Sequence, residues 1–236
     1  MSLFGGTAEW YARYRPRYPQ ELLERLADAA GLDGTGRLLD LGSGPGLLAV
    51  PLAPFVAEVV AADPEPEMLA QLPAGITKRV ARAEEVDETW GSFVLVTIGR
   101  AFHWMDGDVV MERLTRVTKQ VALVGDKIEE SEAETTLLEV AREFFGERPP
   151  MKQPQVRYEQ ALAASPFSDV QVITVEIERT WTIDQLIGFA YSTSFASLAR
   201  VGNRREEFER ALRERFKPSY RERVTVDAVL GRRGDE

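Results

Sequence analysis

The sequence predicts an α/β protein built on a doubly wound, mostly parallel sheet. Short apolar runs recur along the first half of the chain, each separated from the next by a segment with helical spacing of apolar residues. A glycine-rich turn follows the first of these runs, at residues 42–46. Continuous apolar strands that alternate with helices are typical of a parallel sheet covered on both faces. Right-handed crossovers between such strands make a doubly wound sheet the expected form.

The first half should contain five strands and the helices that connect them. The strands are expected at residues 38–41, 59–62, 77–82, 93–98 and 121–124. The helices are expected at residues 20–30, from the glycine turn to about residue 55, at 64–72 and at 109–117. Pro19 can start the first helix and Gly31 can end it, while Asp106 can cap the last.

The second half alternates less regularly. Helices are expected at residues 132–145, 158–164, 183–198 and 204–216, with a proline-rich connector at 147–154. Two strands are expected, at residues 170–181 and 223–230, the first from its partly alternating pattern. No internal repeat or clear domain boundary interrupts the chain, so we expect one domain over residues 1–236.

The composition excludes several classes of protein. The chain has 236 residues with a net charge of -9, which disfavours a partner bound mainly through nucleic-acid phosphates. It has no cysteine and one histidine, so thiolate chemistry and a multi-histidine metal site are excluded. The sequence contains neither an apolar run long enough to span a membrane nor a signal-peptide pattern at its start. We therefore expect a soluble, cytoplasmic protein without a metal.

The glycine turn indicates a ligand of nucleotide type. Residues 38–46 read LLDLGSGPG, a strand followed by three glycines and then a second apolar run. Glycine allows the backbone to approach a ligand closely, and a helix start offers unpaired N–H groups. The third position of a dinucleotide fingerprint falls on Leu47, because the third glycine is Gly46. This spacing disfavours a nicotinamide-dependent oxidoreductase, which stays open as an alternative.

An acidic residue ends the second strand, next to the glycine turn. Asp63 lies 17 residues beyond Gly46, at the carboxyl edge of the expected sheet. A carboxylate in this position can accept hydrogen bonds from both ribose hydroxyls. It can equally cap the helix that Pro64 opens. The two roles are compatible, and we favour the ribose role.

These residues resemble the class I S-adenosylmethionine-dependent methyltransferases, in particular the small-molecule, type 11-like domain. The family pattern hh(D/E)hGxGxG is matched by Asp40, Gly42, Gly44 and Gly46, and Asp63 matches its ribose-binding acid. The resemblance covers about residues 8–125 well. It implies a Rossmann-like, seven-stranded sheet whose last strand is antiparallel, and a helical lid insertion. It also implies S-adenosylmethionine as methyl donor and S-adenosylhomocysteine as product.

The same resemblance assigns roles to segments and residues. It implies a cofactor-covering segment at residues 1–20 and a cofactor-binding core at 21–128. From the sequence itself we expect a lid insertion that caps the sheet at 129–166, and C-terminal strands and helices at 167–236. The cofactor-binding residues that we expect are Asp40, Gly42, Ser43, Gly44, Gly46, Asp63, Met68, Ala83, Glu84, Arg100, Tyr11 and Arg13. Arg13, Arg17 or Arg100 can pair with the carboxylate of the donor, although each can also be a plain surface arginine.

The acceptor side is expected around two aromatic clusters. The substrate-lining candidates are Phe102, Trp104, Tyr191 and Phe195. His103 follows the fourth strand, where it can line the pocket or act as a general base, and we favour the lining role. We expect a small organic acceptor methylated on O, N or C, with no nucleic acid or membrane partner, in a monomer or homodimer. A protein of this fold that binds the cofactor without methylating remains an alternative.

Overall fold

The protein is described from a computed structural model that covers residues 6–127, 131–147, 152 and 157–234. Its contacts divide the chain into two compact units, which we treat separately. The sheet unit comprises Tyr18–Lys127, Met151–Val175 and Thr225–Glu236. The helical unit comprises Met1–Arg17, Ile128–Pro150 and Glu176–Val224.

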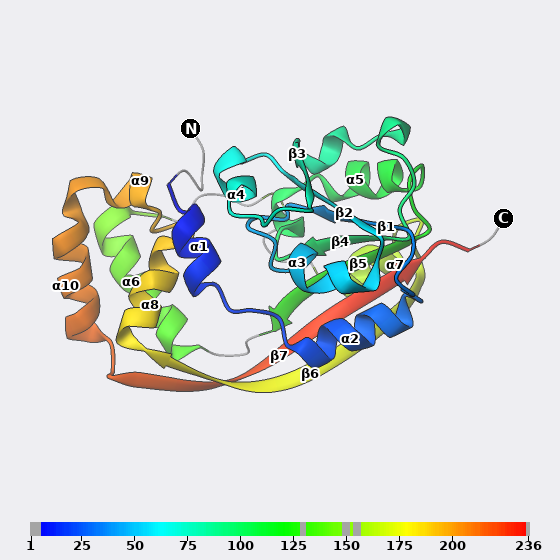
Figure 1. The fold of residues 1–236 in the computed structure, drawn as a ribbon. Coiled ribbons are helices and arrows are strands. Elements are labelled where there is room, and N and C mark those ends of the chain that lie inside the picture. Colours follow the sequence, from blue (N-terminus) through cyan, green and yellow to red (C-terminus); the bar gives the residue numbers. More distant parts are fainter. Residues whose placement is uncertain (1–5, 128–130, 148–151, 153–156, 235–236) are drawn as a thin grey trace. The chain divides into compact units, whose positions relative to one another are not determined.

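A seven-stranded sheet organises the fold, and its strand order is β3-β2-β1-β4-β5-β7-β6 (Figure 1). Its strands are β1 (Arg37–Leu41), β2 (Glu58–Asp63), β3 (Thr77–Val80), β4 (Leu95–Gly99), β5 (Gln120–Lys127), β6 (Asp169–Thr182) and β7 (Ser219–Arg232). The first five strands pair in parallel, and β7 pairs antiparallel with β5. The predicted seven-stranded, mostly parallel sheet with an antiparallel last strand is confirmed.

Helices cover both faces of the sheet within the sheet unit. On one face α2 (Gln20–Ala29) lies beside α3 (Ala49–Leu52) (Figure 1). On the other, α5 (Gly107–Leu114) and α7 (Tyr158–Ala163) supply residues to a buried core with the strands. The helix α4 (Pro66–Ala70) follows β2, and α5 begins at the predicted cap, where the Asp106 carboxylate accepts from the Val109 N–H at 3.4 Å. Burial of these apolar faces drives the layering.

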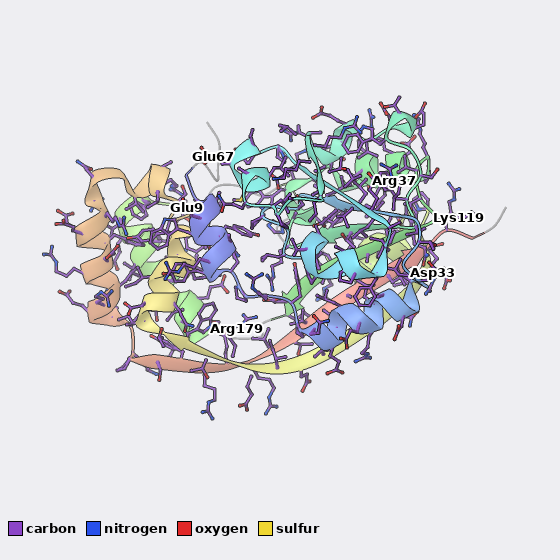
Figure 2. All side chains as sticks on the ribbon, in the orientation of Figure 1. Glu9, Asp33, Arg37, Glu67, Lys119 and Arg179 are labelled. Carbon is purple, nitrogen blue, oxygen red and sulfur yellow. The ribbon has the colours of Figure 1, made fainter. Side chains whose placement is uncertain are left out.

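Parallel strands place all their carboxyl ends at one edge. Asp40 on β1 pairs in register with Ala61 on β2 and Thr97 on β4. Figure 2 shows Asp33, Arg37 and Lys119 together at the opposite, amino edge, where β1 and β5 begin. The carboxyl edge at β1, where neighbouring crossovers diverge to β2 and β4, is therefore the switch point at which such sheets bind ligands.

The helical unit has its own apolar core. Its helices are α1 (Ala8–Tyr14), α6 (Glu132–Phe145), α8 (Ile183–Tyr191), α9 (Leu198–Val201) and α10 (Arg205–Arg215). They pack around a cluster that includes Leu137, Tyr191 and Phe208. The strands β6 and β7 continue into this unit beyond Val175 and before Thr225.

The helix predicted directly after the glycine turn is shorter than expected. Residues 42–48 form turns, α3 begins only at Ala49, and the 3-10 helix η1 (Ala53–Phe55) replaces its last turn. Left-handed glycines hold the chain out of the helical region until Gly46. Pro54 then lies in the first turn of η1, because a proline inside a longer helix would remove a backbone donor and clash with the preceding turn.

The helix predicted at residues 183–198 is also wrong at its end, because α8 stops at Tyr191. The Ser192 hydroxyl donates to the Phe189 carbonyl at 2.6 Å, and the Thr193 hydroxyl donates to the Ala190 carbonyl at 2.6 Å. These hydroxyls occupy carbonyls that further helical N–H groups would use, which is how such residues end helices.

The expected lid insertion contains both predicted helices, but they belong to different units. The helix α6 lies in the helical unit, whereas α7 lies in the sheet unit. Most of the proline-rich connector predicted at residues 147–154 lies outside the described residues. The first five residues of the predicted covering segment lie outside them too.

Candidate cofactor site

The glycine turn leaves β1 at the carboxyl edge of the sheet in a conformation that requires glycine. Gly42, Gly44 and Gly46 have φ values of 61°, 53° and 88°. A Cβ added at Gly42 would lie 2.7 Å from the Cβ of Ala101, and one added at Gly46 would overlap Leu72. The Ser43 N–H donates to the Ala62 carbonyl of β2 at 3.1 Å, which ties the turn to the neighbouring strand.

Asp63 holds this turn from the end of β2. Its Oδ2 accepts from the Gly44 N–H at 2.9 Å, and its Oδ1 accepts from the Glu65 N–H at 2.9 Å. The residue is buried, so these bonds act in a low dielectric. The predicted capping role of Asp63 is wrong, because α4 begins only at Pro66, with Glu65 at its N-cap and no side-chain cap bond. Each carboxylate oxygen of Asp63 keeps a second lone pair for a ligand hydroxyl.

Asp40 holds the other end of the same turn from β1. Its Oδ2 accepts from the Ala49 N–H at the start of α3 at 3.1 Å, and its Oδ1 accepts from the Thr97 hydroxyl at 2.8 Å. Asp40 is 1% exposed and Thr97 is 0% exposed. The carboxylate therefore joins β1, β4 and the start of α3 through buried hydrogen bonds.

Both carboxylates are shifted toward the neutral form. Burial raises the pKa of Asp40 to about 7, repulsion from Asp63 adds to the rise, and the bonds from Thr97 and Ala49 oppose it. Burial also raises the pKa of Asp63, against the backbone bonds from Glu65 and Gly44. Two carboxyls that resist ionisation beside one turn favour a ligand that brings positive charge.

The carboxyl end of β3 contributes the predicted adenine-contacting segment. Ala83 and Glu84 lie in the 3-10 helix η2 (Ala83–Glu85), where Ala83 is buried in the core. The Glu84 Oε1 accepts from the Asp106 N–H at 3.0 Å and from the Lys152 ammonium at 2.9 Å. Burial alone would raise the pKa of Glu84, but these donors outweigh it and lower the pKa to about 2. Met68, on α4, is also buried.

The segment after β4 carries the aromatic candidates. Phe102, His103 and Trp104 form the 3-10 helix η4 (Phe102–Trp104), directly beyond the Ala101 that Gly42 contacts. Phe102 is buried in the core, whereas His103 and Trp104 are half-buried with ring centroids 4.9 Å apart. The side chain of Phe102 therefore packs inside the unit, while His103 and Trp104 keep surface at the carboxyl edge.

Arg100 is held at the carboxyl end of β4 in an unusual backbone conformation. Its φ is 50°, the one positive value at a non-glycine residue in the described part of the chain. Its guanidinium pairs with Asp126 at 2.6 Å and stacks over the ring of Tyr18 with 4.2 Å to the centroid. Strained backbone of this kind collects at ligand sites.

Five candidate site residues lie in the helical unit, and one of them is the exposed Arg17. Tyr11 and Arg13 are on α1, where Arg13 is exposed and the Tyr11 ring lies under the Arg15 guanidinium at 4.8 Å. Tyr191 and Phe195 are buried in the core of the helical unit. The Tyr191 hydroxyl donates to Glu209 at 2.8 Å, and burial with this bond raises its pKa. The other predicted residues come together at the carboxyl edge of the sheet unit.

Sequence reasoning missed four residues that hold this edge. They are Tyr18, Thr97, Asp126 and Lys152. A threonine at the centre of the apolar run 93–98 was the one available signal for Thr97, since a buried hydroxyl needs a partner. The partners of Asp126 and Lys152 depend on tertiary folding, which local pattern does not carry.

The core of the chain is similar to known methyltransferases. Residues 39–124 match a family model described as "Methyltransferase domain". The chain is 38% identical over 129 residues to an uncharacterized methyltransferase of Mycobacterium tuberculosis, a match that takes 53% of this chain and 51% of the relative. A methyltransferase-like protein of Dictyostelium discoideum is 28% identical over 119 residues, 50% of this chain and 45% of its own length. The chain thus spans about half the length of the curated relatives it matches.

Solved structures of other proteins share the fold of this chain over nearly its whole length. A proposed type II methyltransferase from Anaeromyxobacter dehalogenans superposes with a TM-score of 0.57 at 26% identity, over 93% of this chain and 98% of that one. A plantazolicin methyltransferase, solved in complex with S-adenosylhomocysteine, shares the fold with a TM-score of 0.51 at 13% identity, over 97% and 89%. Residues 39–124 therefore carry a methyltransferase domain. The family-model match and the methyltransferase relatives confirm the resemblance inferred from the glycine motif.

The described residues lack two kinds of feature. No helix in the described ranges is long and apolar enough to cross a membrane. No group of three or more His, Cys, Asp or Glu side chains suited to hold a metal ion occurs in this part of the chain.

Proposed function

We propose that this protein transfers a methyl group from S-adenosylmethionine to an O, N or C atom of a small organic acceptor. One observation carries the proposal: a left-handed glycine turn held between two buried carboxylates at the switch point of the sheet. The turn lets a ligand approach the backbone closely, and the carboxylates favour positive charge nearby. These properties suit an amino-acid-bearing nucleoside with a sulfonium better than a pyrophosphate.

The described residues can hold each part of this cofactor. Asp63 has free lone pairs for the ribose hydroxyls, and the segment at Ala83 and Glu84 lies at the strand end expected to contact adenine. The glycine turn would lie along the methionine portion, with Asp40 fixing the turn from beneath. Arg100 is the candidate partner of the carboxylate within the sheet unit.

The protein's part in the reaction is alignment. When bound, S-adenosylmethionine supplies an activated methyl group that a nucleophile of the acceptor displaces in line. The chain must hold donor and acceptor at reacting distance and orientation, which is a large part of the barrier in such a displacement. Trp104 would line the acceptor side, and His103 would line it or take a proton from an acidic O–H or N–H.

The comparisons support methyl transfer over the alternatives. The curated relatives that match are named methyltransferases, and one neighbour in fold was solved with S-adenosylhomocysteine. Leu47 is buried and occupies the third position of a dinucleotide fingerprint. The chain therefore lacks the third glycine of a nicotinamide-binding loop. A net charge of -9 disfavours a nucleic-acid acceptor, and a small molecule is the acceptor class that we propose.

Calorimetric titration tests the proposal. We expect binding of S-adenosylmethionine and of S-adenosylhomocysteine, and no binding of NAD at the same concentrations. Incubation with methyl-labelled donor and candidate small acceptors, followed by mass spectrometry, should then give products heavier by one methylene. Binding of NAD without binding of either sulfur compound would contradict the proposal.

A further inference from the structure

We propose that Thr97 is a positioning residue for the cofactor site, acting through Asp40 to keep its carboxylate charged and the glycine turn in its binding geometry. The inference rests on the proposed function, because it concerns how the same site holds S-adenosylmethionine. It goes further by assigning a role to β4, a strand whose interior the motif does not include.

Thr97, Asp40 and Ala49 are joined by a chain of two hydrogen bonds. The Thr97 hydroxyl donates to Asp40 Oδ1 at 2.8 Å, and Asp40 Oδ2 accepts from the Ala49 N–H at 3.1 Å. Thr97 and Asp40 are directly paired residues of neighbouring parallel strands, so the hydroxyl is held opposite the carboxylate by the strand register. Ala49 is the first residue of α3, and the glycine turn spans the residues between Asp40 and Ala49.

The hydroxyl is one of two hydrogen-bond donors that compensate the buried charge of Asp40. In the described chain, the groups that act on the Asp40 carboxyl are Thr97 from β4, the Ala49 N–H from α3 and the carboxylate of Asp63 from β2. The first two favour the charged form, whereas Asp63 disfavours it. Burial also disfavours it and holds the pKa near neutrality, at about 7. Removing one of the two donors moves the balance toward the neutral acid.

The charge state of Asp40 affects the turn. A carboxylate is a stronger acceptor for the Ala49 N–H than a neutral acid, so ionisation tightens the junction between turn and helix. The positive charge of the ammonium and sulfonium groups of the cofactor also favours ionised Asp40. Cofactor affinity should therefore be greatest above the pKa of Asp40 and fall as the pH drops through it.

Thr97→Val tests this chain of hydrogen bonds, because valine keeps the shape of the threonine side chain and removes its hydroxyl. Thr97→Ser restores the hydroxyl without the methyl group. Thr118→Val is the matched control: Thr118 is also buried in the sheet unit, but its hydroxyl bonds to Gln120 at the amino edge. The dissociation constant of S-adenosylhomocysteine would be measured by calorimetry from pH 6 to pH 9 for all four proteins, together with their unfolding free energies.

The expected result is a shift in the pH profile of Thr97→Val. Near pH 7 its dissociation constant should rise by about ten- to a hundredfold, the size of effect that the loss of a hydrogen bond to a charged group produces. The loss should shrink toward pH 9, where higher pH ionises Asp40 even without the hydroxyl. Thr97→Ser and Thr118→Val should follow the profile of the unchanged protein.

Two outcomes would overturn the inference. One is an unchanged dissociation constant for Thr97→Val at every pH. The other is a loss of the same size at every pH, which a merely structural role would produce. Should Thr97→Val not fold, the unchanged protein still gives a decision, because a flat affinity from pH 6 to pH 9 excludes control by Asp40. Absence of binding at every pH by the unchanged protein contradicts the proposed function itself, and is thus distinct from these results.

Discussion

At the scale of single residues, Asp63 holds two backbone segments at once. Its carboxylate accepts from the Glu65 N–H, just before α4, and from the Gly44 N–H of the glycine turn. A carboxylate with both oxygens engaged in this way is already oriented before a ligand arrives. Its remaining lone pairs then need little reorganisation to accept two hydroxyls.

Replacing this carboxylate should weaken cofactor binding. Asp63→Ala removes the proposed ribose acceptor and one support of the turn, so the binding free energy of S-adenosylhomocysteine should fall by about 1–3 kcal/mol. Calorimetric titration would measure it. Asp33→Ala is the control, because Asp33 also accepts from a backbone N–H two residues on but lies at the amino edge (Figure 2). Equal affinity in Asp63→Ala and the unchanged protein would remove Asp63 from the site.

Much of the site was accessible from single residue types and their spacing. The three glycines, Asp40 and Asp63 were identified because rare backbone angles and buried charges restrict which residues are tolerated. The partners of these residues were not identified, because Thr97 lies 57 positions from Asp40 and only the strand pairing joins them. Sequence spacing gives the groups that a ligand needs but not the groups that orient them.

At the scale of elements, one close approach fixes how α1 packs on α8 in the helical unit. A Cβ added to Gly188 of α8 would lie 2.6 Å from a ring carbon of Tyr14 on α1. The helices α1 and α8 pack against each other, and Tyr14 stacks on Trp10 with 5.4 Å between centroids. The missing side chain of Gly188 therefore leaves the space that the ring of Tyr14 occupies.

A side chain at residue 188 should destabilise the helical unit. Gly188→Ala forces the rigid ring of Tyr14 to move, and overpacking of this kind costs about 1–3 kcal/mol. This loss exceeds the gain of up to about 1 kcal/mol in helix propensity that alanine brings. Denaturant unfolding would measure the change. In Gly188→Ala combined with Tyr14→Ala the penalty should disappear relative to Tyr14→Ala alone; a penalty of full size in the double variant would contradict the packing argument.

The elements themselves were predicted well where long-range sequence pattern decides them. The helix α6 lies at the predicted residues, and the five parallel strands lie within a few residues of the predicted runs. Errors fall at helix ends that local hydroxyls or left-handed glycines decide, as after Tyr191 and before Ala49. The strand β7 extends beyond residues 223–230 on both sides. At its C-terminal end, Gly231 and Arg232 still pair with Val121 and Gln120 of β5, where the apolar pattern has stopped.

At the scale of the whole molecule, ligand binding should raise resistance to heat. A ligand that binds only the folded state stabilises it by about 2.7 kcal/mol at a hundred times its dissociation constant. Differential scanning fluorimetry with S-adenosylhomocysteine should therefore show a higher melting temperature that increases with concentration. NAD at equal concentration is the control. A melting temperature that does not change across this range would count against a preformed site in the sheet unit.

The division into two units was not predictable from composition, because no linker-like segment marks it. Each unit collects pieces from three separate parts of the chain, and β6 and β7 cross from one to the other without interruption. Local signals report where an element begins or ends. They do not report which elements share a core, which depends on apolar faces brought together by the complete topology.

The antiparallel pairing of β5 with β7 has a consequence for synthesis on the ribosome. The strand β5 ends at Lys127, but its partner residues run from Thr225 to Arg232. At a translation rate of about 5–20 residues per second, this separation leaves β5 without its partner for roughly 5–20 seconds. During that interval the nascent sheet exposes a row of unpaired backbone groups along β5. We expect this open edge to be where chaperones or mispairing compete with correct folding.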